Sequence, residues 1–293
     1  MSLVARTEDR SDLIDLRVGC RIQYLAEEEG THAVLLVEPH SSLQGAILAA
    51  GWEPEPTPAG FTDVYGNRCR RLDLGPERSL FAYDATVAVS RHPESMPAES
   101  DVQHRIEDLP SELLHWLLPS RLCESDLLLD ATWDMFGETP RGAGRVAAIC
   151  DWIHDNVAYG VPSIQTTTVA EVLERRGGMC RDFAHLGVTF CRALGIPARY
   201  VFGYMPDIGI PGPFPPMDFH AWFEVWLGER WWTYDARFNT PRIGRLPIGR
   251  GRDAIDVAMV TTYGPASLET MTVWADETSS ESEPVGVGGS HGR

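Results

Sequence analysis

Two segments decide the fold of this chain: R-R-G-G-M-C-R-D-F-A-H-L at residues 175–186, and D-F-H-A-W-F-E-V-W-L-G-E-R-W-W-T-Y-D at residues 218–235. The first segment places Cys180 directly after a Gly-Gly break, where a helix is expected to begin. The second places His220 on a strand and Asp235 at the end of the following strand. A thiol, an imidazole and a carboxylate in this order are the groups that a nucleophilic cysteine enzyme requires.

The residues after Cys180 predict a helix whose apolar side chains recur on one face: Phe183, Leu186, Phe190 and Leu194. Gly195, followed by Ile-Pro, ends it. Cys180 therefore lies in the first turn, where unpaired N–H groups and the positive end of the helix dipole favour a thiolate. The same N–H groups can stabilise an oxyanion. Asp182 opposes a thiolate in this turn, and Arg181 offsets it.

The second segment predicts a β-hairpin. Two alternating sets of residues face opposite sides of its first strand: Phe219, Ala221, Phe223, Val225 and Leu227 on one, and His220, Trp222, Glu224 and Trp226 on the other. Gly228-Glu229 is expected to form a two-residue type II′ turn. Counting outward from that turn pairs Trp222 with Asp235 and makes His220 a diagonal neighbour of Asp235, about 7–8 Å away between Cα atoms. The hairpin thus predicts a His–Asp hydrogen bond. The alternative is that His220 is merely a partly exposed polar residue of the strand.

Two other interpretations of these polar residues were weighed. His185 is the rival imidazole, but it lies more than a turn beyond Cys180, so we expect a structural role. A metal site could use Cys180, His185, Cys191 and His220. Their C-x4-H-x5-C spacing fits no common zinc site, and Cys191 does not share a helix face with His185.

Six cysteines are scattered without C-x-x-C spacing: Cys20, Cys69, Cys123, Cys150, Cys180 and Cys191. The first ten residues carry acids and no apolar run, so we expect no signal peptide. Reduced thiols and a cytoplasmic location are therefore expected. We expect Cys123, Cys150 and Cys191 to be small buried hydrophobic residues.

The rest of the chain divides into parts. Residues 12–95 contain alternating β-rich runs at 17–26, 31–38, 61–73 and 80–89, which predict a β-sandwich or barrel without chemistry of its own. Residues 96–275 form the expected catalytic core. It begins with part of a polar linker (92–108), continues with helices near 113–118, 127–135, 146–157 and 168–177, and ends with closing strands after residue 249. Residues 276–293 are acidic and Gly/Ser-rich, which predicts a disordered tail.

Composition limits the partners. Hydrophobic residues make up 43% of the 293 residues, which is enough for a sizeable core. The formal net charge of −17 argues against nucleic acid and against an anionic membrane surface as partners. No apolar run approaches the length needed to span a bilayer.

Four stretches together resemble the transglutaminase-like superfamily, in particular its bacterial members with a β-rich N-terminal domain: G-G-M-C-R-D-F-A-H-L, C-R-A-L-G-I-P-A-R-Y-V-F-G-Y, H-A-W-F-E-V and W-W-T-Y-D. The resemblance covers residues 144–239, with weaker similarity in D-V-Y-G-N-R and G-R-D-A-I-D-V-A. It implies an α+β fold: a papain-like core with helices packed on an antiparallel sheet, and a β-sandwich-like N-terminal domain.

The resemblance also implies a chemistry. Cys180 would be the nucleophile, His220 the general base and acid, and Asp235 the group that orients His220. The implied reaction is acyl transfer from an amide or peptide carbonyl through a thioester, as in an amidase, a peptidase or a transglutaminase-type transferase. The acceptor would be water or an amine. The alternative is a protein-interaction module that keeps this fold without turnover.

The chain departs from the family pattern in two ways. Many relatives have Asp-Pro-Thr where this chain has Asp235-Ala236-Arg237, which changes the loop after the aspartate. Cross-linking animal relatives also place an upstream indole at the oxyanion hole; Trp152 and Gln165 are the candidates for oxyanion contacts here. We expect no cofactor, and no calcium dependence, because no acidic calcium loop is visible.

The loop at residues 207–217, with four prolines and two glycines, precedes His220. It is expected to be irregular. One hypothesis is that it covers the cleft, with Phe214 and Met217 as apolar contacts; the other is that it has no part in catalysis.

Overall fold

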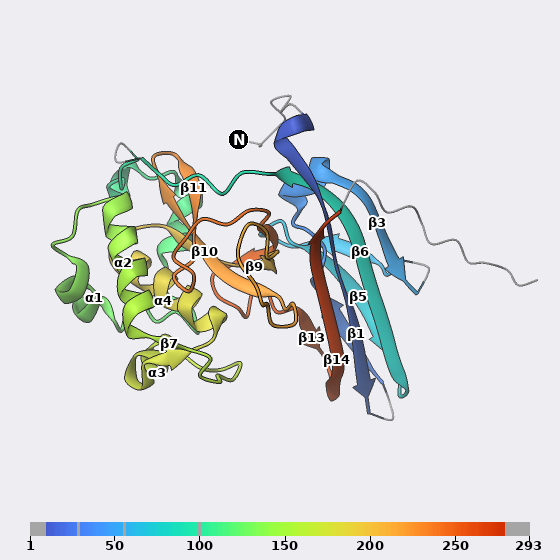
Figure 1. The fold of residues 1–293 in the computed structure, drawn as a ribbon. Coiled ribbons are helices and arrows are strands. Elements are labelled where there is room, and N and C mark those ends of the chain that lie inside the picture. The colour runs from blue at the N-terminus through green and yellow to red at the C-terminus, as the bar shows by residue number, and fades with distance from the viewer. Residues whose placement is uncertain (1–9, 28–29, 55–56, 99–100, 279–293) are drawn as a thin grey trace, which may run out of the picture.

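A computed structural model describes residues 10–27, 30–54, 57–98 and 101–278 of the chain. Helices gather on one side of the molecule and two β-sheets on the other, with a third sheet between them (Figure 1). The expected α+β fold, with helices packed on an antiparallel sheet, is confirmed.

The strands are β1 (Leu13–Ala26), β2 (Thr31–Leu35), β3 (Ile47–Glu53), β4 (Gly60–Thr62), β5 (Arg68–Leu74), β6 (Arg78–Ser90), β7 (Ala158–Tyr159), β8 (Gly177–Gly178), β9 (Ala198–Tyr204), β10 (His220–Leu227), β11 (Arg230–Tyr234), β12 (Leu246–Gly251), β13 (Val260–Thr262) and β14 (Ala266–Glu277). The α-helices are α1 (Leu129–Phe136), α2 (Ala143–Asn156), α3 (Val169–Arg175) and α4 (Cys180–Ala193). Short 3-10 helices are η1 (Arg10–Asp12), η2 (Ser41–Ala46), η3 (Ile106–Asp108) and η4 (Ser111–Leu117).

The N-terminal sheets are antiparallel and have the strand orders β14-β1-β6-β3 and β13-β2-β5-β4. Alternate residues of β1 are buried, as the period of two predicts. Leu16, Val18 and Ile22 from one sheet join Leu35 and Leu74 from the other in one apolar cluster. The β-rich prediction for this region therefore holds, although it did not include β3 or the helix η2.

The last two strands, β13 and β14, do not extend the core sheet. This differs from the sequence-based division, which assigned the closing strands to the core. β14 pairs with β1 along most of its length, and β13 pairs with β2. Both strands thus complete the N-terminal sheets, because their unpaired edges accept the returning chain. Of the predicted tail, residues 276 and 277 belong to β14, and residues 279–293 lie outside the described residues.

The core is built around α4. This helix packs against β9 and β10 of the sheet β11-β10-β9-β12, and α1, α2 and α3 pack against it. Its polar face is as buried as its apolar face: Asp182, His185, Thr189 and Arg192 are at most 4% exposed. Arg192 offsets its burial by donating hydrogen bonds to the carbonyls of Ala198, Arg252 and Leu118.

The two halves are joined by buried hydrogen bonds. Asn67 is fully buried; its side chain donates to the carbonyl of Arg250 (2.9 Å) and accepts from the N–H of Arg250 (2.7 Å). The hydroxyl of Tyr204 donates to the carbonyl of Val37 at 2.8 Å. The Asn of the D-V-Y-G-N-R stretch therefore docks the N-terminal domain onto β12.

Alanine at position 187 is expected to destabilise the protein. A Cβ at Gly187 of α4 would lie 2.4–2.8 Å from ring atoms of Phe223, which is fully buried on β10. Overpacking of this kind lowers the free energy of unfolding by about 1–3 kcal/mol, more than the helix propensity of alanine returns (up to about 1 kcal/mol). Urea denaturation measures the change. Gly45→Ala is the control, because a Cβ there meets nothing within 4 Å; an unchanged or raised stability of Gly187→Ala would contradict this packing.

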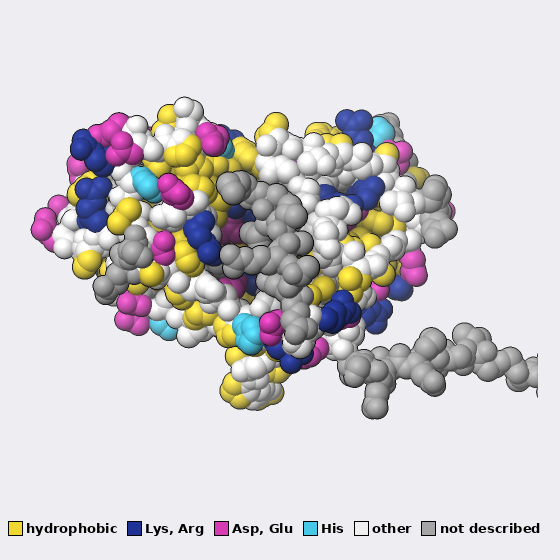
Figure 2. Space-filling view, turned by 90° about the horizontal axis from the view of Figure 1, so that it is seen from above, with side chains coloured by type: hydrophobic (Ala, Val, Ile, Leu, Met, Phe, Trp, Pro, Cys, Tyr) yellow, Lys and Arg dark blue, Asp and Glu magenta, His cyan; other side chains and the backbone are white. Residues whose placement is uncertain are grey.

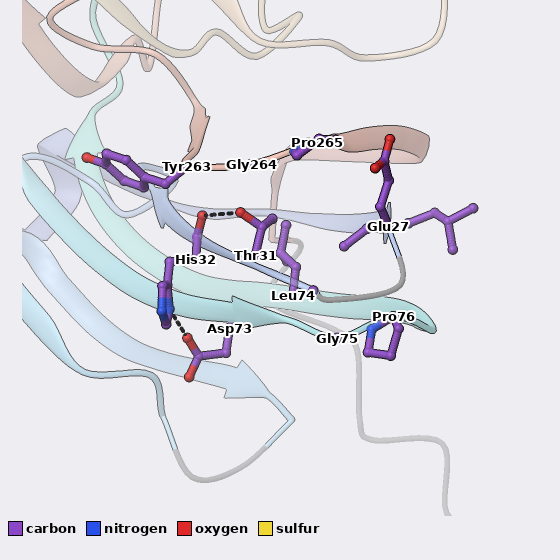
Figure 3. A pocket seen from close by; sticks show the side chains of 13 residues that line it. Glu27, Thr31, His32, Asp73, Leu74, Gly75, Pro76, Tyr263, Gly264 and Pro265 are labelled. Atoms are coloured by element: carbon purple, nitrogen blue, oxygen red, sulfur yellow. Dashed lines mark hydrogen bonds and ion pairs between the residues drawn. The ribbon is translucent and has the colours of Figure 1, made fainter.

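The surface of the helix-bearing half carries acidic side chains around its outer edge, with basic ones between them (Figure 2). An open hollow lies at the end of the N-terminal sheets, and the residues that line it include Tyr263 and the exposed, hydrogen-bonded His32 and Asp73 (Figure 3). In the described part of the chain, no helix combines the length and the hydrophobicity needed to cross a bilayer.

Candidate active site

Cys180 is the first residue of α4, as the Gly-Gly break predicts. Gly178 pairs with Tyr159 in the short parallel ladder of β8 and β7, which fixes the approach of the chain to the helix. Met179 is the N-cap residue, and its N–H donates to the Asp182 carboxylate at 2.8 Å. This bond, which the sequence analysis did not anticipate, gives Asp182 a capping role. The Cys180 side chain is partly exposed, and its residue opens the first turn of the helix.

The other five cysteines are buried, and all six are free. Burial raises the pKa of each of the five, for example to about 11 for Cys69 and to about 12 for Cys123. The expectation that Cys123, Cys150 and Cys191 are buried hydrophobic residues is confirmed. Cys180 is thus the one thiol of the chain that combines exposure with a lowered pKa.

The hairpin has the predicted register. Trp226 pairs with Trp231 and Leu227 with Arg230, so His220 and Asp235 lie on one face. The turn type differs from the prediction: Gly228 and Glu229 have φ values of 53° and 69°. Positive φ values at both turn residues identify a type I′ turn, whereas in a type II′ turn only the first residue has a positive φ. The register survives because both turns have two residues, and because I′ matches the twist of the strands.

The predicted His–Asp hydrogen bond is present. The Nε2–H of His220 donates to Oδ2 of Asp235 at 2.8 Å, and both side chains are at most 4% exposed. This bond leaves Nδ1 of His220 available to the thiol of Cys180, and the two side chains lie close enough for each to shift the pKa of the other. The structure thus brings together the three residues that the sequence analysis selected.

Charges at the site favour a thiolate–imidazolium pair. Burial raises the pKa of Cys180, but the hydrogen bond and charge of His220, the N–H of Ala221 and the charge of Arg237 together bring it below the ordinary thiol value. Burial lowers the pKa of His220, but Asp235 and Cys180 outweigh it, so the net shift is upward. Each partner therefore favours the charged form of the other.

Asp235 is held by residues that the sequence analysis missed. Arg245, 2% exposed, donates from Nη1 to Oδ2 of Asp235 at 2.8 Å and from Nε to Glu94 at 2.6 Å. The N–H of Arg237 donates to Oδ1 of Asp235 at 3.0 Å. Burial alone would raise the pKa of Asp235, but His220 and Arg245 keep it far below its usual range. No local pattern signals this cluster, because Glu94 lies 151 residues from Arg245.

The two oxyanion candidates have different positions. The Trp152 ring packs edge-on against Phe136 and Phe190 in the core. Phe190 lies ten residues along α4 from Cys180, or about 15 Å at the rise of an α-helix. Trp152 is therefore not placed as an oxyanion donor, because packing with α1 and α4 holds its indole. Gln165 is exposed in the loop whose Ser163 and Ile164 bind Arg181, so it stays a candidate.

His185 has the expected structural role. It is 1% exposed, and its Nε2 accepts the N–H of Ala254 at 3.1 Å. Burial lowers its pKa to about 3, which keeps the ring neutral. Cys191 belongs to the apolar core cluster. Among the residues that the structure describes, no three His, Cys, Asp or Glu side chains gather as metal ligands.

The loop at residues 207–217 has no regular structure, as predicted. Met217 packs partly against the core, and Phe214 is 45% exposed. A covering role for this loop stays a prediction.

Comparisons with known proteins identify the family of the chain. The family model for the transglutaminase-like superfamily matches residues 134–236. The crystal structure of a candidate cysteine protease from Cytophaga hutchinsonii is similar over 93% of each chain, with 30% identity and a TM-score of 0.77. An uncharacterised protein of Mycobacterium leprae is 34% identical over 124 residues, which cover 41% of this chain and 43% of that protein. One from Mycobacterium tuberculosis H37Rv is 36% identical over 101 residues, which cover 31% of this chain and 32% of that protein.

This chain belongs to the transglutaminase-like superfamily, as the motifs predicted. It matches less than half the length of the curated mycobacterial relatives.

Proposed function

We propose that the protein is a cysteine-dependent acyl-transfer enzyme that acts on an amide or peptide carbonyl. The observation that carries the proposal is the chain of contacts from Cys180 to His220 and from His220 to Asp235. It supplies a nucleophile, a base and an orienting carboxylate in one buried cluster. The name of the Cytophaga hutchinsonii relative, a candidate cysteine protease, supports the same class of reaction.

In the acylation step the Cys180 thiolate attacks the carbonyl carbon and forms a C–S bond. The oxyanion of the tetrahedral intermediate faces the N–H groups that begin α4. The C–N bond then breaks, and the imidazolium of His220 gives its proton to the leaving amine. This leaves a thioester on Cys180 and a neutral His220.

In the deacylation step His220 takes a proton from the acceptor, which attacks the thioester and releases the thiolate. Water as the acceptor gives hydrolysis, the reaction of an amidase or peptidase. An amine gives a new amide, the reaction of a transglutaminase-type transferase. Asp235 keeps Nδ1 of His220 directed at the sulfur throughout, since it holds Nε2. A cytoplasmic location and a peptide or amide substrate remain part of this proposal.

Alkylation with iodoacetamide tests the nucleophile. Selective labelling of Cys180 alone is not informative, because the other five thiols are buried. The informative measurement is the pH dependence of the labelling rate. The thiolate fraction falls as the pH drops through the pKa of Cys180, which lies below the ordinary value. We expect rapid labelling at about pH 6–7 and a rate at least about tenfold lower in His220→Ala, where burial raises the thiol pKa unopposed.

Mass spectrometry maps the adduct, and unfolded protein, in which all six thiols react, is the control. A rate that titrates at the ordinary thiol pKa, or that is the same in His220→Ala, would favour the non-catalytic interaction module.

A further inference from the structure

Arg237 lies beside the catalytic groups and is stacked between two aromatic rings. Its guanidinium carbon is 3.6 Å from the ring centroid of Tyr159 and 4.4 Å from that of Phe238. Tyr159 pairs with Gly178, two residues before Cys180. The Phe238 ring centroid is 5.4 Å from that of His220. The two rings thus hold the cation near both the nucleophile and the base.

The backbone of Arg237 is fixed on both sides. Its N–H donates to Asp235, and its carbonyl accepts from Nδ1 of His154 at 2.9 Å. The guanidinium, by contrast, has no hydrogen-bond or ion-pair partner among the described residues. Arg242 also lies over the Phe238 ring, but its guanidinium has partners: it binds Asp207 and the carbonyl of Pro206. Arg237 is a pre-positioned cation with its donors unfilled.

The neighbouring acids do not supply the missing partner. Asp235 is occupied by His220 and Arg245. Asp218, two residues before His220, accepts the N–H of Phe219 at 2.7 Å. A partly exposed guanidinium between aromatic rings offers two parallel N–H groups, the arrangement that binds a carboxylate in bidentate fashion.

We propose that Arg237 forms an anion subsite beside Cys180 that binds a carboxylate of the substrate. The substrate class is then an acidic peptide or amide. This inference rests on the proposed function, since it places the carboxylate next to the bond that Cys180 attacks.

Two alkylating agents test the subsite without a substrate. Iodoacetate carries a carboxylate and iodoacetamide does not, while both react with the same sulfur. The ratio of their rate constants at Cys180 is expected to fall by about tenfold in Arg237→Gln, the loss of one charge-assisted interaction, and to be partly retained in Arg237→Lys. A ratio that is unchanged in Arg237→Gln would overturn the proposal.

The ratio separates this subsite from a simpler electrostatic effect. If Arg237 only stabilised the thiolate, its loss would slow both reagents equally and leave the ratio unchanged. Arg230→Gln is the matched control, because Arg230 also stacks on an aromatic ring, Trp232, but lies at the far end of the hairpin. We expect the wild-type ratio in that variant. An equal drop in Arg230→Gln would attribute the effect to overall charge and overturn the subsite.

The test also separates this proposal from the proposed function. If labelling of Cys180 depends on His220 but the reagent ratio ignores Arg237, the subsite fails and the enzyme class stands. If the ratio depends on Arg237 but the rate ignores His220, the acyl-transfer function fails and an anion site remains.

Peptide substrates identify where the carboxylate comes from. One pair of peptides differs by Glu or Gln beside the scissile amide, and a second pair ends in a free or an amidated carboxyl group. In the pair that carries the recognised carboxylate, the peptide with the carboxylate is expected to have a kcat/KM about tenfold higher than its uncharged counterpart. This preference is expected to be lost in Arg237→Gln. Equal kcat/KM values within both pairs would contradict the proposal.

Discussion

His220→Ala is expected to lower kcat/KM by about 10⁴-fold, the effect of losing a base that activates a nucleophile. The variant removes the proton acceptor and the charge that stabilises the Cys180 thiolate. It should remain folded, because Asp235 keeps its ion pair with Arg245 and the N–H of Arg237. Hydrolysis of a mixture of N-acylated peptide 4-nitroanilides measures the loss.

His185→Gln is the matched control for this variant. His185 is a buried histidine on the same helix as Cys180, but it only accepts a backbone hydrogen bond, which the glutamine oxygen can accept instead. We expect activity per folded molecule within about threefold of wild type, because the change leaves the reacting groups in place. The reverse pattern, with His185→Gln inactive and His220→Ala active, would transfer the role of base to His185.

Arg245→Met is expected to lower the free energy of unfolding by about 3–5 kcal/mol, the range for breaking a buried ion pair by removal of one partner. The methionine fills much of the volume but leaves Asp235 and Glu94 without their shared cation. The guanidinium also lies 4.9 Å from the ring centroid of Trp222, a contact that is lost as well. Urea denaturation at neutral pH measures the effect.

Arg17→Met is the contrasting variant, because the Arg17–Asp84 pair is exposed to 60% and 46%. An exposed pair contributes only about 0–1 kcal/mol, so its removal should have little effect. Equal stability losses in the two variants would show that Arg245 does not act through its buried partners. Compared with its two single variants, the double variant Glu94→Gln, Arg245→Met measures the coupling energy between Glu94 and Arg245.

The core elements could be predicted because each follows a short-range pattern. Alternation at a period of two identifies β10, and the two-residue turn sets its register with β11, so the His220–Asp235 bond follows from local sequence. The helix period and the Gly-Gly break place Cys180 at a helix start. The helix predicted near 168–177 is present as α3, and a capping box of Thr168 and Glu171 begins it.

The features that the sequence-based prediction placed wrongly depend on contacts between distant segments of the chain. The position of β14 against β1 depends on which sheet edge is free, and the strand's own residues do not reveal that. The indole of Trp152 could point into the cleft or into the core, and packing with Phe136 and Phe190 decides between them. The turn type depends on the twist of the finished hairpin as well as on the glycine.

Local sequence patterns are enough to identify the reacting groups: a cysteine at a helix start, a histidine on a strand and an aspartate one hairpin turn away. Their electrostatic surroundings depend on contacts that form only in the folded protein. Arg245 precedes β12, which pairs with β9, so assembly of the core sheet brings it to Asp235, and Glu94 reaches Arg245 only when the segment after the N-terminal domain packs on the core. The reason is physical: periodicity and turn geometry act over a few residues, whereas buried charges find their partners only when separate layers pack together.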